Sequence, residues 1–415
     1  MATPHHLRLL GRTFSGFEQA LSRQVSAFHS HRPDIEVQLD FLEPQELYAL
    51  AFDQGSLADG SIDVALLLTD WLPEAISREL ILPLDSFFAH ASPDGWPEGW
   101  SPSLRQLQCD IQGQTYALPY HDGPMVLIYR KDLLTDEAER AAFFHQYKRE
   151  LRVPKTWQEY VDIARFFTRP ERDLYGTVAA GLNDAHNNVY DFLIHLWSRG
   201  GQLQEPDGRL TVDTPIGREA LQFHIDLFNR YSVTPPEAKR LDSVAAGAYY
   251  ASGHAAMTVN WCGFATMAEL PAASQIVGRS ATALVPRGDY PQGAHVSINV
   301  YWVLAIARGC SRPDLAYEML RWIARPDMDQ ITAQEGCIAT RYSTWRDPKT
   351  LTQFPVYATI EAVHRRVHSP PPLLTWPAVT EVLNQAIDDA LYERQSVPVA
   401  LRWAQREIDR LTRPR

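Results

Sequence analysis

The sequence predicts an α/β protein built from two lobes. Its 415 residues exceed what one ordinary hydrophobic core supports, and the usual size of a domain suggests two or three, of which two lobes is the simplest interpretation. Hydrophobic residues make up 45% of the chain and charged residues 21%, which is a globular composition. The first part of the chain alternates between strand-like and helix-like spacing, which is typical of a parallel sheet flanked by helices.

The first strand and helix of this pattern lie within residues 7–28. Leu7, Leu9 and Leu10 open a short strand. From position 14 to position 28, apolar residues recur every three or four positions, the spacing of one buried helix face. Ser15 is followed three residues later by Glu18, which matches a capping box. The pattern predicts a helix that begins near Ser15.

The next segments complete a βαβαβ unit. Apolar and polar residues alternate over residues 35–41, a helical stretch can begin after Pro44, and residues 64–68 are all apolar, as in a strand buried on both faces. Open parallel sheets bind ligands beyond the carboxyl ends of their strands. We therefore expect ligand contacts at residues 13–17 and 69–71.

The rest of the chain reads as a second α/β layer without internal repeats or a low-complexity linker. The expected elements are a helix after Pro154, strands at 175–180, 255–259, 283–285 and 300–307, helices between 192 and 231, and two terminal helices within 379–411.

Charge and hydropathy exclude two kinds of partner. The formal net charge of −11 argues against nucleic acid, since such binders concentrate lysine and arginine. The longest apolar run, residues 300–307, is far shorter than the roughly 18 residues that a membrane-spanning helix needs.

The four cysteines, at positions 109, 262, 310 and 337, form no C-x-x-C pair and no zinc spacing. We expect buried free thiols, with a Cys310–Cys337 disulfide as the alternative.

Several motifs follow one another in a specific order. They are D-V-A-L-L-L-T-D-W at 63–71, L-I-L-P-L-D at 80–85, G-Q-T-Y-A-L-P-Y at 113–120, L-I-Y-R-K-D-L-L at 127–134, P-K-T-W-Q-E at 154–159 and Y-Y-A-S-G-H-A-A-M at 249–257. Together they resemble the ABC-importer extracellular solute-binding proteins of family 1, the sugar-binding family that includes maltose-binding protein. One departure is a tyrosine where the family's "F-x-x-G-x-A-A-M" stretch has phenylalanine. Each motif alone is weak, but the ordered set covers nearly the whole chain.

The resemblance implies a two-lobed periplasmic-binding-protein fold, similar to type II, with a ligand cleft between lobes that are joined by hinge crossings. The crossings are expected near 121–124, 295–300 and 337–344. The N-terminal lobe would comprise residues 1–122 plus 299–340, and the C-terminal lobe residues 123–298 plus 341–415.

The resemblance also implies a function: capture of a sugar or sugar derivative by hinge closure and delivery to a membrane permease. The sequence contains no G-x-S-x-G, G-x-x-x-x-G-K-[ST], G-x-G-x-x-G or H-E-x-x-H motif of an enzyme. We therefore expect no catalytic residues, no cofactor and no metal. A glycosidase-type hydrolase stays open as an alternative, as does the same receptor fold with a polyamine, an osmolyte or a glycerol phosphate ester as ligand.

Aromatic residues with polar neighbours are the first candidates for ligand contact, because flat rings pack on sugar C–H faces. Trp71 and Asp70 follow the strand at 64–68, and Trp261 and Asn260 follow the strand at 255–259. Trp376 matches a C-terminal aromatic that closes the cleft in maltose-binding protein. For each tryptophan, packing in the protein's own core is the competing interpretation.

Polar residues in the expected crossings are the second set. Asp122 can accept hydrogen bonds from two hydroxyls or serve as a turn residue, and His121 precedes it. Asn299 and Tyr301 share one strand face, with Asn299 favoured. Arg341 would suit an acidic or phosphorylated sugar, and a structural ion pair is the equal alternative.

Two further expectations concern loops. Ser15 stands in the first turn after a strand, and the polar loop at 183–188 offers His186 or Asn187.

Residues 1–6 lack the charged start and apolar stretch of a secretory signal. With the family resemblance, we expect a periplasmic or extracellular monomer whose signal has been removed.

Overall fold

The computed structural model describes residues 5–105, 109–111, 113–184 and 187–413. It divides into two compact units: unit 1 is Met1–Gly123 with Asn299–Gln353, and unit 2 is Pro124–Ile298 with Phe354–Arg415. The first two divisions fall within one residue of the expected crossings. The third differs, because residues 341–353, which we expected in the second lobe, belong to unit 1.

Unit 1 is built on a five-stranded sheet with the order β2-β1-β3-β12-β6. The β1 strand pairs in parallel with β2 and β3, so the predicted βαβαβ unit is confirmed. The β12 strand returns from much later in the chain and runs antiparallel to β3 and β6. Every residue of β3 is buried, as its unbroken apolar sequence predicted. The strands of this sheet are β1 (His5–Arg12), β2 (Ile35–Leu42), β3 (Val64–Leu68), β6 (Leu118–His121) and β12 (Trp302–Ile306).

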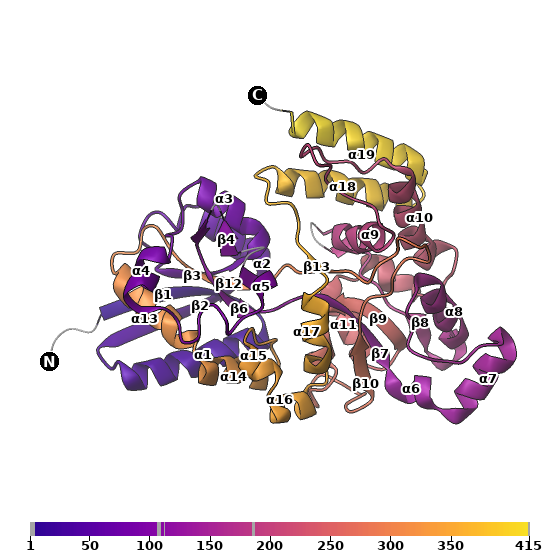
Figure 1. The fold of residues 1–415 in the computed structure, drawn as a ribbon, viewed down its shortest axis with the longest axis horizontal. Coiled ribbons are helices and arrows are strands. Elements are labelled where there is room, and N and C mark those ends of the chain that lie inside the picture. Colours follow the sequence, from indigo (N-terminus) through magenta and orange to yellow (C-terminus); the bar gives the residue numbers. More distant parts are fainter. Residues whose placement is uncertain (1–4, 106–108, 112, 185–186, 414–415) are drawn as a thin grey trace. The chain divides into compact units, whose positions relative to one another are not determined.

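Three helices of unit 1, α1, α13 and α14, pack on one another beside this sheet (Figure 1). The helices of unit 1 are α1 (Ser15–His31), α2 (Pro44–Tyr48), α3 (Leu72–Ser77), α4 (Asp85–Ala91), α5 (Pro102–Leu104), α13 (Pro313–Ile323), α14 (Pro326–Gln334), α15 (Tyr342–Trp345) and α16 (Pro348–Gln353). A π-helix η1 (Ala49–Asp53), a 3-10 helix η2 (Thr69–Trp71) and the small hairpin of β4 (Asp110–Ile111) and β5 (Gln114–Thr115) complete the unit.

Unit 2 has a four-stranded sheet with the order β10-β7-β9-β8. The β7 strand is antiparallel to both β10 and β9, and β8 is parallel to β9. A short parallel pair, β11 with β13, stands apart from this sheet. The strands are β7 (Met125–Arg130), β8 (Tyr175–Thr177), β9 (Ala255–Trp261), β10 (Ser280–Ala283), β11 (Ser297–Ile298) and β13 (Val367–His368).

A helical layer of α9, α10, α18 and α19 packs together in unit 2, while α8 and α11 lie against strands β8 and β9 (Figure 1). The helices are α6 (Lys131–Thr135), α7 (Glu137–Tyr147), α8 (Trp157–Phe167), α9 (Asn187–Ser198), α10 (Pro215–Asn229), α11 (Ser243–Ala251), α12 (Gly263–Met267), α17 (Tyr357–His364), α18 (Trp376–Leu391) and α19 (Val397–Leu411), with 3-10 turns η4 (Pro170–Arg172) and η5 (Pro236–Arg240). The predicted helix after Pro154 and both terminal helices are confirmed.

The starts of helices α8 and α1 differ in whether a side chain caps them. Thr156 caps α8 by accepting a hydrogen bond from the backbone N–H of Glu159 at 3.3 Å, as the P-K-T-W-Q-E motif suggests. The capping box predicted at Ser15 is wrong: the helix begins at Ser15 without a side-chain cap, and the Ser15 Oγ accepts from Gln19 Nε2 instead.

The four cysteines are all buried free thiols, so the alternative Cys310–Cys337 disulfide does not form. Over the described ranges, none of the helices combines the length and apolar character needed to cross a membrane.

Candidate functional site

One edge of the unit 1 sheet gathers several predicted site residues. The carboxyl ends of β1, β3 and β6 meet there, together with the amino end of β12, because β12 runs antiparallel to its two neighbours. Thr69 fixes the turn after β3: its backbone N–H donates to Tyr301 O at 3.0 Å, and its Oγ1 accepts from Tyr301 N at 3.2 Å. The position of Asp70 and Trp71 is therefore set by the start of β12.

Trp71 lies in an aromatic cluster of unit 1 with only 7% of its surface exposed. Its ring meets Trp302 edge-on at 5.7 Å between centroids, Tyr48 at 5.3 Å and Phe52 at 6.1 Å. These contacts support the core-packing interpretation of Trp71. Asp70, the preceding residue, is half-buried at the same edge.

Arg12, the last residue of β1, was not among the predicted site residues. Its guanidinium carbon lies 5.3 Å from the ring centroid of Trp302, 5.5 Å from Phe14 and 5.9 Å from Phe17, which are cation–π distances. The sequence signal was its position directly before the 13–17 turn. Ligand contacts were expected only from residue 13 onward, one residue after Arg12.

His121, at the end of β6, is half-buried in the same region. Its Nδ1 accepts a hydrogen bond from the backbone N–H of Ile338 at 3.0 Å, and its ring packs on Phe17 at 4.7 Å. Burial, with a smaller contribution from the Arg12 charge, lowers the pKa of His121 to about 3. The imidazole is thus neutral at physiological pH. Because Nδ1 accepts, its proton is on Nε2, which makes His121 a hydrogen-bond donor.

Asp122 and Asn299 form a direct pair where unit 1 ends. Asn299 Nδ2 donates to Asp122 Oδ1 at 2.9 Å, and both side chains are fully buried. The same Asp122 oxygen accepts from the backbone N–H of Gly123 at 2.9 Å. A Cβ at Gly123 would stand 2.9 Å from Val300 O, so the backbone approach requires glycine. The pair joins two segments that are 177 residues apart in the chain.

Two predicted residues of unit 1, Tyr301 and Arg341, are engaged in contacts within the protein. The Tyr301 side chain is fully buried, and its hydroxyl donates to Leu104 O. Arg341 is 5% exposed, its guanidinium donates to Ala324 O at 2.7 Å and Asp94 O at 2.6 Å, and it stacks on Trp100 at 4.0 Å.

Arg341 also explains why residues 341–353 belong to unit 1. Its backbone N–H and the Thr344 hydroxyl both donate to the buried Asp329 carboxylate. These bonds hold the segment after Thr340 on α14. Ser15, in contrast, is exposed at the sheet edge.

In unit 2, Trp261 stands at the carboxyl end of β9, next to β7. Its indole is half-buried, and Nε1 donates to Asn187 Oδ1 at 3.1 Å. Its ring meets Tyr190 edge-on at 5.9 Å. Asn187 is in turn held by Asp184, whose Oδ1 accepts the Asn187 backbone N–H at 2.8 Å. The structure thus orients Trp261 through the first residue of α9, which the sequence named in the 183–188 loop.

The other predicted site residues of unit 2 are Asn260, Trp376 and His186. Asn260 is 3% exposed, and both ends of its amide bond the backbone: Nδ2 donates to Ser243 O at 3.0 Å, and Oδ1 accepts from Trp261 N at 2.8 Å. Trp376, the first residue of α18, is 2% exposed, and its Nε1 has no hydrogen-bond partner among the described residues. His186 lies outside the described residues.

One family model matches most of this chain. The model of the family described as "Bacterial extracellular solute-binding protein" matches residues 11–330. A mannitol-binding protein of Pseudomonas aeruginosa is 24% identical over 371 residues, which cover 86% of this chain and 79% of that protein.

Two solved structures share the fold. A maltose-bound MalE3 from T. maritima has a TM-score of 0.84 at 24% identity and covers 98% of this chain and 99% of its own. An ABC transporter solute-binding protein from Agrobacterium radiobacter K84, in complex with ribitol, has a TM-score of 0.85 at 20% identity and covers 98% of each chain.

The matched residues span well over half of the sequence, and they include the motifs from 63–71 to 249–257 on which the family resemblance rested. That resemblance and the two-lobed fold it implied are confirmed, and the hydrolase alternative loses its support. This chain belongs to the bacterial extracellular solute-binding proteins, a family of receptors rather than of enzymes.

Proposed function

We propose that this chain is the receptor of an ABC importer that captures a neutral sugar or sugar alcohol outside the cytoplasm and delivers it to a membrane permease. One observation carries the proposal: the half-buried indole of Trp261 is held by Asn187 at the carboxyl end of β9. An indole that is packed on one side and fixed by its N–H offers a flat apolar face to a sugar ring or polyol chain.

The similar proteins support the same ligand class. One is named for mannitol, and the two solved structures contain maltose and ribitol. These ligands share several adjacent hydroxyls and carry no charge. The sheet edge of unit 1 brings side chains of both signs, Arg12 and Asp70, together with the neutral donor His121. Such a mixture suits hydroxyl groups, which both donate and accept hydrogen bonds.

We propose hinge closure as the mechanism. A ligand that contacts both lobes binds the closed state more tightly than the open one, and so shifts the population toward closure. In this scheme Trp261 and Asn187 contribute from unit 2, and Asp70, His121 and Arg12 from unit 1. Trp376 remains a candidate for apolar contact and Ser15 for a polar one, while we assign Trp71 to the aromatic core of unit 1. We assign Arg341, Tyr301 and Asn260 structural roles, and the pair of Asp122 and Asn299 the role of joining two crossings.

Isothermal titration calorimetry of the purified chain tests the ligand class. Mannitol, ribitol and maltose represent the proposed class, spermidine a cation, and glycerol phosphate an anionic ester. We expect saturable binding of at least one neutral polyol or sugar. Binding of only spermidine or only glycerol phosphate would contradict the proposed class while leaving the receptor role intact.

Small-angle scattering tests the mechanism. Addition of a saturating ligand should reduce the radius of gyration of a monomer, and an unchanged radius would argue against closure.

A further inference from the structure

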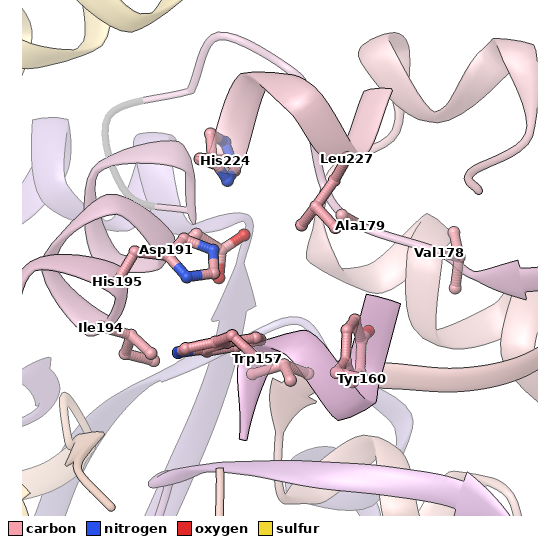
Figure 2. A pocket seen from close by; sticks show the side chains of 10 residues that line it. Trp157, Tyr160, Val178, Ala179, Asp191, Ile194, His195, His224 and Leu227 are labelled. Carbon is pink, nitrogen blue, oxygen red and sulfur yellow. The ribbon is translucent and has the colours of Figure 1, made fainter. Parts of the chain in front are cut away.

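A small cavity lies inside unit 2, among helices α8, α9 and α10, the loop that follows β8 and strand β9. It leaves a volume of about 20 Å³ for the centre of a water-sized sphere. A cavity that admits one such sphere, which itself occupies roughly 10–15 Å³, can hold a water molecule. The cavity therefore has room for at least one water molecule and is too small for a sugar. Its lining residues include Trp157, Tyr160, Asp191, His195, His224 and Leu227 (Figure 2).

Two imidazoles at this cavity have unsatisfied nitrogens. His195 is 4% exposed and His224 is 1% exposed. The Nδ1 atoms of both rings are buried without a hydrogen-bond partner in the described part of the chain. An unsatisfied buried polar atom is destabilising, so two of them beside one cavity indicate an occupant that can form hydrogen bonds.

The proton of His224 can be placed from its neighbours. Asn188 Nδ2 donates to Gly181 O at 3.1 Å and to Leu182 O at 2.9 Å, which fixes Asn188 Oδ1 as an acceptor. His224 Nε2 lies 3.3 Å from that oxygen and must donate to it. Burial lowers the pKa of His224 to about 4, so the ring is neutral. Its Nδ1 is therefore a bare acceptor.

His195 and Asp191 also line the cavity, and His195 can donate a hydrogen bond to an occupant. His195 packs on Trp157 at 4.4 Å and on Phe223 at 5.0 Å, and burial together with the charge of Arg199 holds its pKa well below the usual value. Asp191 stands four residues earlier on α9, one turn away. Burial, with the charge of Asp184, raises the pKa of Asp191. A neutral His195 with its proton on Nδ1 can donate to a water oxygen.

A metal ion is the other occupant that imidazoles could hold. Across the described residues, however, the His, Cys, Asp and Glu side chains form no group of three or more that could bind one. The ring centroids of His195 and His224 lie 5.6 Å apart, and both residues line the cavity.

We propose that this cavity is a binding site for one internal water molecule, which donates to His224 Nδ1 and accepts from His195 Nδ1–H. The water joins α9 to α10 through hydrogen bonds that the side chains do not make directly. Helix α9 begins with Asn187, the residue that orients Trp261. By bonding α9 to α10, the water would therefore help to fix the position of α9 and so the unit 2 part of the proposed ligand site. This inference does not depend on the identity of the ligand.

Histidine ¹⁵N NMR of the wild-type protein at pH 7 is the first test, and it needs no variant. We expect His224 as the Nε2–H tautomer and His195 as the Nδ1–H tautomer, both neutral. A His224 that carries its proton on Nδ1, or a charged ring at pH 7, overturns the proposal.

Water relaxation dispersion is the second test, because it counts long-lived internal water molecules. The variant His224→Phe should lose one such water relative to wild type, and Leu227→Met, which changes an apolar lining residue, should keep it. An equal count in wild type and His224→Phe overturns the proposal. A crystal structure of the wild type resolves the case of a variant that does not fold: an empty cavity in the density contradicts the water site.

Discussion

Trp71, at the edge of the unit 1 sheet, and Trp261, at the edge of the unit 2 sheet, differ in how far other side chains enclose their rings. In unit 1, Trp71 is packed edge-on against three aromatic rings and is 7% exposed. In unit 2, Trp261 is half-buried and is held by one hydrogen bond to Asn187 and one ring contact to Tyr190. Trp71 follows the carboxyl end of β3, and Trp261 is the last residue of β9.

The comparison shows that position in the topology does not decide the role of a side chain. A ring enclosed by other rings contributes to folding, because its apolar area is already removed from water in the absence of ligand. A ring with one free face can still bury that face against a ligand. In the proposed site, unit 1 would therefore contribute mainly polar groups, and unit 2 the apolar face of Trp261.

The largest expected effect is on stability, at Trp71. Trp71→Ala should lower the free energy of unfolding by about 3–5 kcal/mol, as truncation of a buried aromatic ring does. Denaturant unfolding followed by circular dichroism measures it, and Trp71→Phe, which keeps a ring in the cluster, should lose much less. If Trp71→Ala instead leaves stability unchanged and weakens ligand binding tenfold, Trp71 is a ligand-contacting ring and the contrast between the units fails.

The second effect is a pH dependence inside unit 2. The folded-state pKa of His224 is about 4, below its unfolded value of 6.5, so the unfolded chain binds more protons between these values. Its contribution is present above pH 6.5 and is lost as pH falls toward 4, amounting to at most about 3 kcal/mol. Calorimetric melting from pH 7 to pH 4 measures the decline. The variant His224→Gln should show a shallower decline; an identical slope would mean that His224 is not the group responsible.

The third effect is on affinity, at Trp261. Trp261→Ala should weaken ligand binding by about 1–3 kcal/mol, because the free face of the ring is lost. Calorimetric titration measures it. Trp322→Ala is a matched control, since Trp322 is also half-buried but packs on His31 and Arg325 in unit 1. Unchanged affinity in Trp261→Ala would remove Trp261 from the site.

The smallest effect is at Asn187, which orients the Trp261 indole. Asn187→Ala removes the acceptor of the Trp261 N–H and should weaken ligand binding by about 1 kcal/mol, the usual net value of one hydrogen bond. Comparison with the double variant Asn187→Ala/Trp261→Phe separates the two roles. If Asn187 acts only by orienting the indole N–H, its loss should have little further effect once that N–H is absent. Full additivity would indicate a direct contact between Asn187 and the ligand.

The sequence by itself determined the family and most of the fold, because those depend on patterns among neighbouring residues. The apolar run of β3, the helical spacing of α1 and the Thr156 cap of α8 are local, and the ordered motifs placed them in one family. Trp261 at the end of β9 was found by the same local logic.

Only the tertiary structure decided which candidates were already engaged in the protein's own contacts. Arg341 bonds Asp94, 247 residues away, and Asn299 bonds Asp122, 177 residues away. Neither partner can be seen from spacing along the chain, because a buried polar group is satisfied by whatever the fold brings beside it. Arg12 was missed for the same reason, because its aromatic neighbour Trp302 belongs to a strand much later in the chain. The cavity lined by His195 and His224 was also invisible in the sequence, because it forms only where α9 packs on α10.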